Sequence, residues 1–131
     1  MDIRPARAFD LQAPENQGCS NELPVDLDHL RRYTLGDKAL EDEVLGLFLA
    51  QLPETIAALR SAATERDWKM AAHTLKGSSR AVGAWRIARL AQQAEALVCS
   101  VEPEACSDAI SKLEAAASEA STFFHQSSKL A

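Results

Sequence analysis

One histidine and three cations recur along the stretch KMAAHTLKGSSR, residues 69–80, at a spacing typical of one helix face. Lys69, Lys76 and Arg80 stand at positions −4, +3 and +7 relative to His73. At about 100° per residue, all three fall within about 60° of the histidine. The large apolar residues of this segment fall on the opposite side, so His73 is expected to face solvent.

An exposed imidazole among cations suits nucleophilic chemistry on an anionic group. Imidazole has a reference pKa of about 6.5, and nearby cations disfavour its protonated form. A phosphoryl group on a ring nitrogen would bring oxygens that an ammonium one turn away can pair with, and Lys76 stands there. The pattern predicts a phosphoacceptor or anion site at His73. The alternative is a solvated histidine on a solvated cationic face. His29 and His125 are both interpreted as solvated surface histidines.

Gly77 and Met70 lie on the same helix face as His73. Glycine in a helix interior costs about 1 kcal/mol relative to alanine, so its presence needs a reason. A missing side chain one turn beyond His73 would let another protein approach, and an exposed methionine would offer it adaptable apolar contact. A helical glycine can also mark close packing inside the chain, and both explanations are open here.

Hydrophobic periodicity predicts the helices that carry this face. The expected ranges are about 25–33, 38–64, 68–82, 85–100 and 103–125. Asp37 and Asp67 are expected N-caps, Gly83 a helix end, and Pro53 a kink. The buried stripe of the second helix is expected to comprise Leu40, Val44, Leu47, Phe48, Leu52, Ile56 and Leu59. Four long amphipathic helices and short turns predict an all-α, up-down-up-down antiparallel four-helix bundle, capped at one end by the short N-terminal helix.

Composition and charge exclude several functional classes. The chain has 131 residues, 47% hydrophobic and 5% aromatic, which suits one helical domain. The prediction is a flexible N-terminal arm over residues 1–22 and a bundle domain over 23–131. A net charge of −5 argues against nucleic-acid binding, although residues 67–89 carry five basic side chains and one acidic. No apolar run approaches the roughly 18 residues of a membrane span, so no membrane contact is expected.

Three cysteines, Cys19, Cys99 and Cys106, match no zinc spacing. They are interpreted as reduced thiols of a cytoplasmic protein. Cys99 and Cys106 could approach each other across a turn between helices, but nothing in the sequence demands a bond. No metal site is expected at His73 either, because the position four residues on is a glycine.

The segment AHTLKGSS, residues 72–79, closely resembles the signature of the histidine-containing phosphotransfer (HPt) domain of two-component phosphorelays. VDLDHLRRYTLGD, FLAQLPETIAAL and VGAWRIARLAQQAEAL resemble other helices of that family, so the resemblance covers residues 25 to about 124. It implies a four-helix bundle with His73 as phosphoacceptor, Lys76 paired with the phosphoryl group and Gly77 admitting the partner. Arg80 begins a run, RAV, that departs from the smaller or amide-bearing residues of many members, and could influence which partner docks.

The function implied by the resemblance is that of a phosphocarrier. His73 would accept a phosphoryl group from a phospho-aspartyl receiver domain or a histidine kinase and relay it to a response regulator. The implied partners are therefore receiver domains and a sensor or hybrid histidine kinase, with Mg²⁺ supplied by the receiver and no cofactor in this chain. The chain has no Gly-rich phosphate loop, so no ATP-dependent kinase activity is expected. A free-standing monomer is the expected form.

Two other functions are weighed against this one. A binding-only module would dock on a receiver or kinase and regulate it without carrying phosphate. An enzyme that uses His73 as a general base would need a pocket and an orienting carboxylate. The helix face shows no such carboxylate, because Asp67 lies at its far end.

Overall fold

The computed structural model describes residues 23–130 of the chain, with side chains described through residue 126. Within this range the structure contains five helices and no strand. They are α1 (Leu27–Thr34), α2 (Lys38–Arg60), α3 (Glu65–Val82), α4 (Trp85–Glu95) and α5 (Pro103–Leu130). The predicted arm, residues 1–22, lies outside the described residues.

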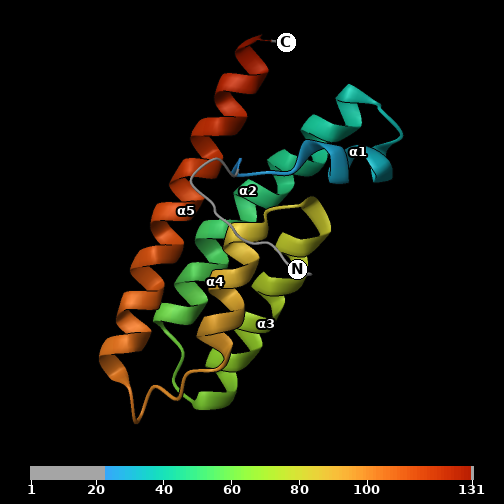
Figure 1. Cartoon of the computed structure of the whole chain (residues 1–131). Helices are drawn as coiled ribbons and strands as arrows, with labels where there is room; N and C mark the ends of the chain where they lie inside the picture. The colour runs from blue at the N-terminus through green and yellow to red at the C-terminus, as the bar shows by residue number, and fades with distance from the viewer. Residues whose placement is uncertain (1–22, 131) are drawn as a thin grey trace, which may run out of the picture.

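The four long helices form the predicted bundle. Figure 1 shows α2, α3, α4 and α5 lying side by side with alternating direction. Each packs against the next along the chain, and α5 closes the ring against α2. The short helix α1 lies across one end of the bundle, against α2 and α3 (Figure 1). The prediction of an all-α antiparallel bundle with a capping helix is confirmed.

Side-chain caps explain where α2 and α3 begin. Asp37 caps α2 as predicted, and its side-chain carboxylate accepts the backbone N–H of Leu40 at 3.2 Å. The predicted cap of α3, Asp67, is wrong, because the hydroxyl of Thr64 accepts the backbone N–H of Asp67 at 3.0 Å. Thr64 is therefore the N-cap, and α3 begins three residues earlier than predicted. Residues 61–64 form the turn between α2 and α3, so α2 ends at Arg60 and not at residue 64 as predicted.

The turn between α3 and α4 fixes the start of α1. Gly83 ends α3 with a φ of 82°, and a Cβ there would stand 2.8 Å from the carbonyl oxygen of Asp26. The Asp26 N–H donates to the Gly83 carbonyl at 2.8 Å, and its carboxylate accepts the indole N–H of Trp85 at 3.0 Å. His29 packs half-buried against the rings of Trp85 and Tyr33. The interpretation of His29 as a solvated side chain is therefore wrong, because α1 folds it onto this turn.

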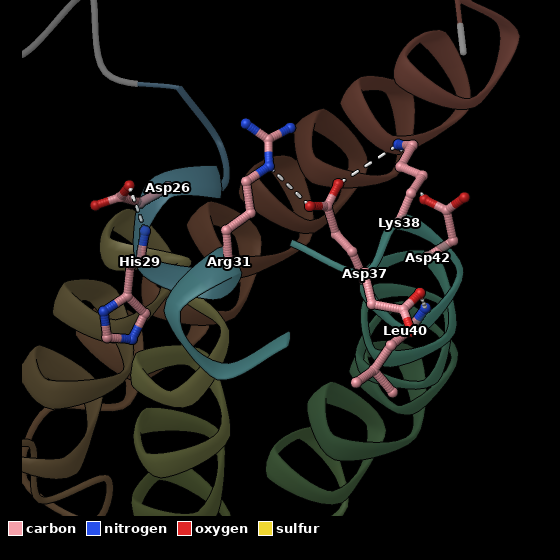
Figure 2. Close-up of polar contacts among 8 residues, drawn as sticks. Asp26, His29, Arg31, Asp37, Lys38, Leu40 and Asp42 are labelled. Atoms are coloured by element: carbon pink, nitrogen blue, oxygen red, sulfur yellow. Dashed lines mark hydrogen bonds and ion pairs between the residues drawn. The ribbon is translucent and has the colours of Figure 1, made fainter. Parts of the chain in front are cut away.

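A buried carboxylate ties α1 to α2. Glu41 is only 2% exposed, although it lies in the first turn of α2. Its oxygens accept hydrogen bonds from Arg31 Nε of α1 at 2.9 Å and from Lys38 Nζ at 3.4 Å (Figure 2). Lys38 also pairs with Asp42 at 3.2 Å. These contacts satisfy a charge that would otherwise be costly to bury.

Side chains from all four long helices fill the core. The largest buried ones include Phe48, Leu52, Trp68, Leu75, Ile87 and Leu113. Two expected members of the α2 stripe face solvent instead, since Leu40 is 40% and Leu47 is 60% exposed. The α2 helix runs without interruption through Pro53, and the expected kink there stays a prediction.

The end of α4 differs from the expectation. This helix ends at Glu95, five residues before the predicted end. Cys99, in the turn that follows, forms a disulfide with Cys106 in the first turns of α5. The interpretation of these two cysteines as reduced thiols is therefore wrong, and Cys19 lies outside the described residues. Within the described part of the chain, no helix combines the length and apolar character needed to cross a membrane.

Candidate functional site

His73 lies in the middle of α3 and points outward. Its side chain is 70% exposed, whereas Trp68, Ala72, Leu75, Ser79 and Val82 form the buried side of the same helix. The outward direction predicted from the helical spacing is confirmed.

A carboxylate from a different helix contacts the imidazole. Glu95, the last residue of α4, places Oε2 3.3 Å from His73 Nδ1. Its other oxygen, Oε1, lies 2.7 Å from Lys76 Nζ. One carboxylate thus bridges the histidine and the lysine that the sequence placed one turn apart. The sequence analysis considered the α3 face alone, and the carboxylate that contacts His73 comes from α4.

The sequence did contain a signal for Glu95. Two antiparallel helices joined by a short turn lie level at residues equally distant from that turn. His73 is ten residues before Gly83, and Glu95 is eleven residues after Ala84. Counting away from the turn would therefore have placed Glu95 at about the height of His73, but not the direction of its side chain.

Electrostatics hold Glu95 in its charged form. The hydrogen bond from Lys76 is the main cause that lowers the pKa of Glu95 below its ordinary value. The charge of Lys76 and the contact with His73 lower the same pKa further, while partial burial opposes them. At neutral pH the group that touches the imidazole is therefore an acceptor carrying a negative charge.

The three predicted cations share the His73 face, but each reaches toward α4. Lys76, only 18% exposed, pairs with the Glu95 carboxylate. Lys69 Nζ donates to the backbone oxygen of Glu95 at 2.8 Å, and Arg80 donates to the side chain of Gln92 at 2.9 Å. The cations therefore attach α3 to α4 as well as surrounding the histidine.

An open groove runs along α3 from its first turn to His73. Its lining consists of Glu65, Arg66, Lys69, Met70, His73, Thr74 and Glu95. Met70 is 58% exposed, which agrees with its predicted place on the same helix face as His73. Arg66 was not among the sequence-derived candidates, although it stands seven residues before His73 on the same face.

Gly77 leaves empty space beside the histidine. A Cβ built at this position would meet no atom of the described residues within 4 Å. Within the described part of the chain, this glycine therefore does not serve close packing. Ser78 and Ser79, the next residues, differ from each other. The Ser78 hydroxyl donates to the Thr74 carbonyl at 3.0 Å, whereas Ser79 is fully buried.

Comparison with known proteins identifies the family. A family model described as the Hpt domain matches residues 43–123, from within α2 to within α5. Neither a curated protein nor a solved structure gave a match. The family match covers well over half of the chain and includes the histidine, the lysine and the carboxylate described above. The chain therefore belongs to the Hpt domain family, which carries out phosphotransfer in two-component relays.

Proposed function

We propose that this protein carries a phosphoryl group on His73, accepts it from a phospho-aspartyl receiver domain or a histidine kinase, and passes it to a response regulator. The observation that carries the proposal is an imidazole that is 70% exposed in the middle of a helix, with an ammonium one turn away. Membership of the Hpt domain family supports the same chemistry.

The reaction needs little from this chain beyond a placed nucleophile. A ring nitrogen of neutral His73 attacks the phosphorus of an aspartyl phosphate, and a nitrogen–phosphorus bond forms. The phosphorus–oxygen bond to aspartate breaks, and its electron pair leaves with the carboxylate. The Mg²⁺ that neutralises the phosphoryl oxygens would belong to the receiver domain. Lys76 stands where its ammonium can pair with those oxygens on the histidine side.

The face around His73 is the proposed docking surface. Lys69, Met70, Gly77 and Arg80 surround the histidine and would contact the partner. Gly77 contributes space, and Met70 contributes exposed apolar surface. The proposed partners are receiver domains and a sensor or hybrid histidine kinase, which this protein would meet in the cytoplasm as a monomer.

Phosphotransfer from a radiolabelled, phosphorylated receiver domain tests the proposal. Wild type should gain acid-labile, alkali-stable label, and His73→Gln should gain none. His125→Gln is the matched control, because His125 is also exposed on a helix and should keep full labelling. Incubation with ATP alone should label neither protein. If a folded wild-type protein takes no label from a full panel of receivers, a binding-only docking module becomes the better explanation.

A further inference from the structure

We propose that Arg66 determines which partner this site accepts, by pairing with a carboxylate that the receiver domain presents about 10 Å from its reacting aspartate. The inference rests on the proposed function, because it concerns the domain that docks on His73. It assigns recognition to the first turn of α3, two helical turns before the histidine.

Arg66 lies in line with His73 along α3. Seven residues are almost two full turns, so the two side chains leave the helix in directions that differ by about 20°, with about 10 Å between them along the axis. Both line the same open groove, and so does Met70 between them. A protein interface of ordinary size buries about 800 Å² on each partner, which is a disc of about 16 Å radius. A partner centred on His73 therefore reaches Arg66.

Arg66 is the cation of this face whose charge stays available to a partner. The side chains of Lys69, Lys76 and Arg80 all bind groups of α4. Arg66 is exposed, and its guanidinium makes no hydrogen bond or ion pair within the described part of the chain. A docking domain can pair with this guanidinium without first breaking a bond inside the protein.

The place of Arg66 in its helix is unfavourable for a cation. The structure starts α3 at Glu65, so Arg66 lies in the first turn, where unpaired backbone N–H groups carry a partial positive charge. Acidic side chains suit this turn, and Glu65 and Asp67 on either side are acidic. A guanidinium that is disfavoured by its own helix and binds no described residue fits a role in recognising another molecule.

The chemistry of the guanidinium specifies a carboxylate. Its planar fork of N–H donors matches the two oxygens of a carboxylate, and such a charged pair is stronger than a neutral hydrogen bond. The phosphoryl group could also use this fork, but it is transferred at His73, about 10 Å away along the helix. Receivers with a carboxylate at the matching place are therefore favoured, and receivers with a lysine or arginine there are repelled.

Single-turnover transfer measures this recognition, with the labelled receiver domain that reacts fastest with wild type. Arg66→Gln should raise the half-saturating receiver concentration about tenfold, because a charged hydrogen bond is lost, and Arg66→Glu should raise it further. The maximal rate at saturation should not change, since Arg66 touches no reacting atom. High salt should reduce both effects. Both variants should also unfold at a higher urea concentration than wild type, because a cation leaves the first turn of α3.

Lys112→Glu is the matched control, because it changes the net charge as much as Arg66→Glu does. It lies on α5, which does not contact α3 in the described structure, and it loses only an exposed ion pair with Asp108. Its half-saturating concentration should equal that of wild type. Arginine in place of the receiver carboxylate about 10 Å from the acceptor aspartate should restore recognition of Arg66→Glu.

An unchanged half-saturating concentration in Arg66→Glu, or an equal rise in Lys112→Glu, would overturn the role of Arg66 and leave the proposed function standing. Failure of wild type to take label from any receiver would instead overturn the proposed function, together with the inference that rests on it.

Discussion

Replacing Gly77 with alanine should stabilise the protein and inhibit phosphotransfer at the same time. The new Cβ meets no atom of the described residues within 4 Å, and the φ of Gly77 is not positive, so the full helix-propensity gain should appear. That gain is about 1 kcal/mol in the free energy of unfolding, or about 4 °C in melting temperature for a domain of this size. Urea and thermal unfolding followed by far-ultraviolet circular dichroism measure it.

The same methyl group should obstruct the partner. Gly77 lies one turn from His73 on one face, and reacting atoms must approach to about 3–3.5 Å. A displacement of about 1 Å can cost about a hundredfold in rate, so transfer from a labelled receiver should slow on the order of a hundredfold. A more stable protein that reacts much more slowly would separate docking from folding.

Gly46→Ala is the matched control for this prediction. Gly46 also lies inside a helix, and a Cβ there meets no atom of the described residues within 4 Å. The guanidinium of Arg60 binds Glu114 of α5, which marks the side of α2 that faces α5. Gly46 stands about 40° around the helix axis from Arg60, so Gly46 lies on that same side. Gly46→Ala should gain similar stability with unchanged transfer. A transfer rate in Gly77→Ala equal to that of wild type would refute the role of Gly77 in docking. An unchanged free energy of unfolding would refute the inference that the space beside Gly77 can hold a methyl group.

Three further predictions concern stability. Arg31→Ala should lower the free energy of unfolding by about 2 kcal/mol, because it removes a charged hydrogen bond to buried Glu41. Urea titration measures the loss. An unchanged free energy of unfolding would show that this bond does not hold α1 in place. Cys106→Ser removes the disulfide to Cys99 and should lower the free energy of unfolding by about 2.5 kcal/mol, through the loop-closure entropy of the unfolded chain. An equal loss in the reduced wild type would confirm that the disulfide is the origin of this stability. The folded-state pKa of Glu95 lies below its ordinary value of 4.5, so its stabilising contribution is complete above that pH and lost as the pH falls through the lower folded value. Unfolding between pH 6 and 3 should therefore depend less on pH in Glu95→Gln, and an unchanged slope would contradict this.

Periodicity within single helices determined most of what the sequence could predict. The spacing around His73 placed the histidine outward and Leu75 inward, because both directions depend only on the helical repeat. Gly83 was correctly predicted as a helix end, since a left-handed residue there favours glycine. The four amphipathic stripes and short turns similarly required an antiparallel bundle.

Contacts between helices decided the rest. Leu40 and Leu47 satisfy the apolar stripe of α2 yet stay exposed, while Glu41 is buried because α1 supplies Arg31 to its carboxylate. Glu95 reaches His73 only because α3 and α4 pack in one particular register. A helical repeat fixes the direction of a side chain around its own axis, and counting from a short turn gives its approximate height. Only the packing of α3 against α4 decides whether two side chains at that height meet. The sequence alone therefore determined the helix face on which His73 lies, and the tertiary structure decided which carboxylate contacts it.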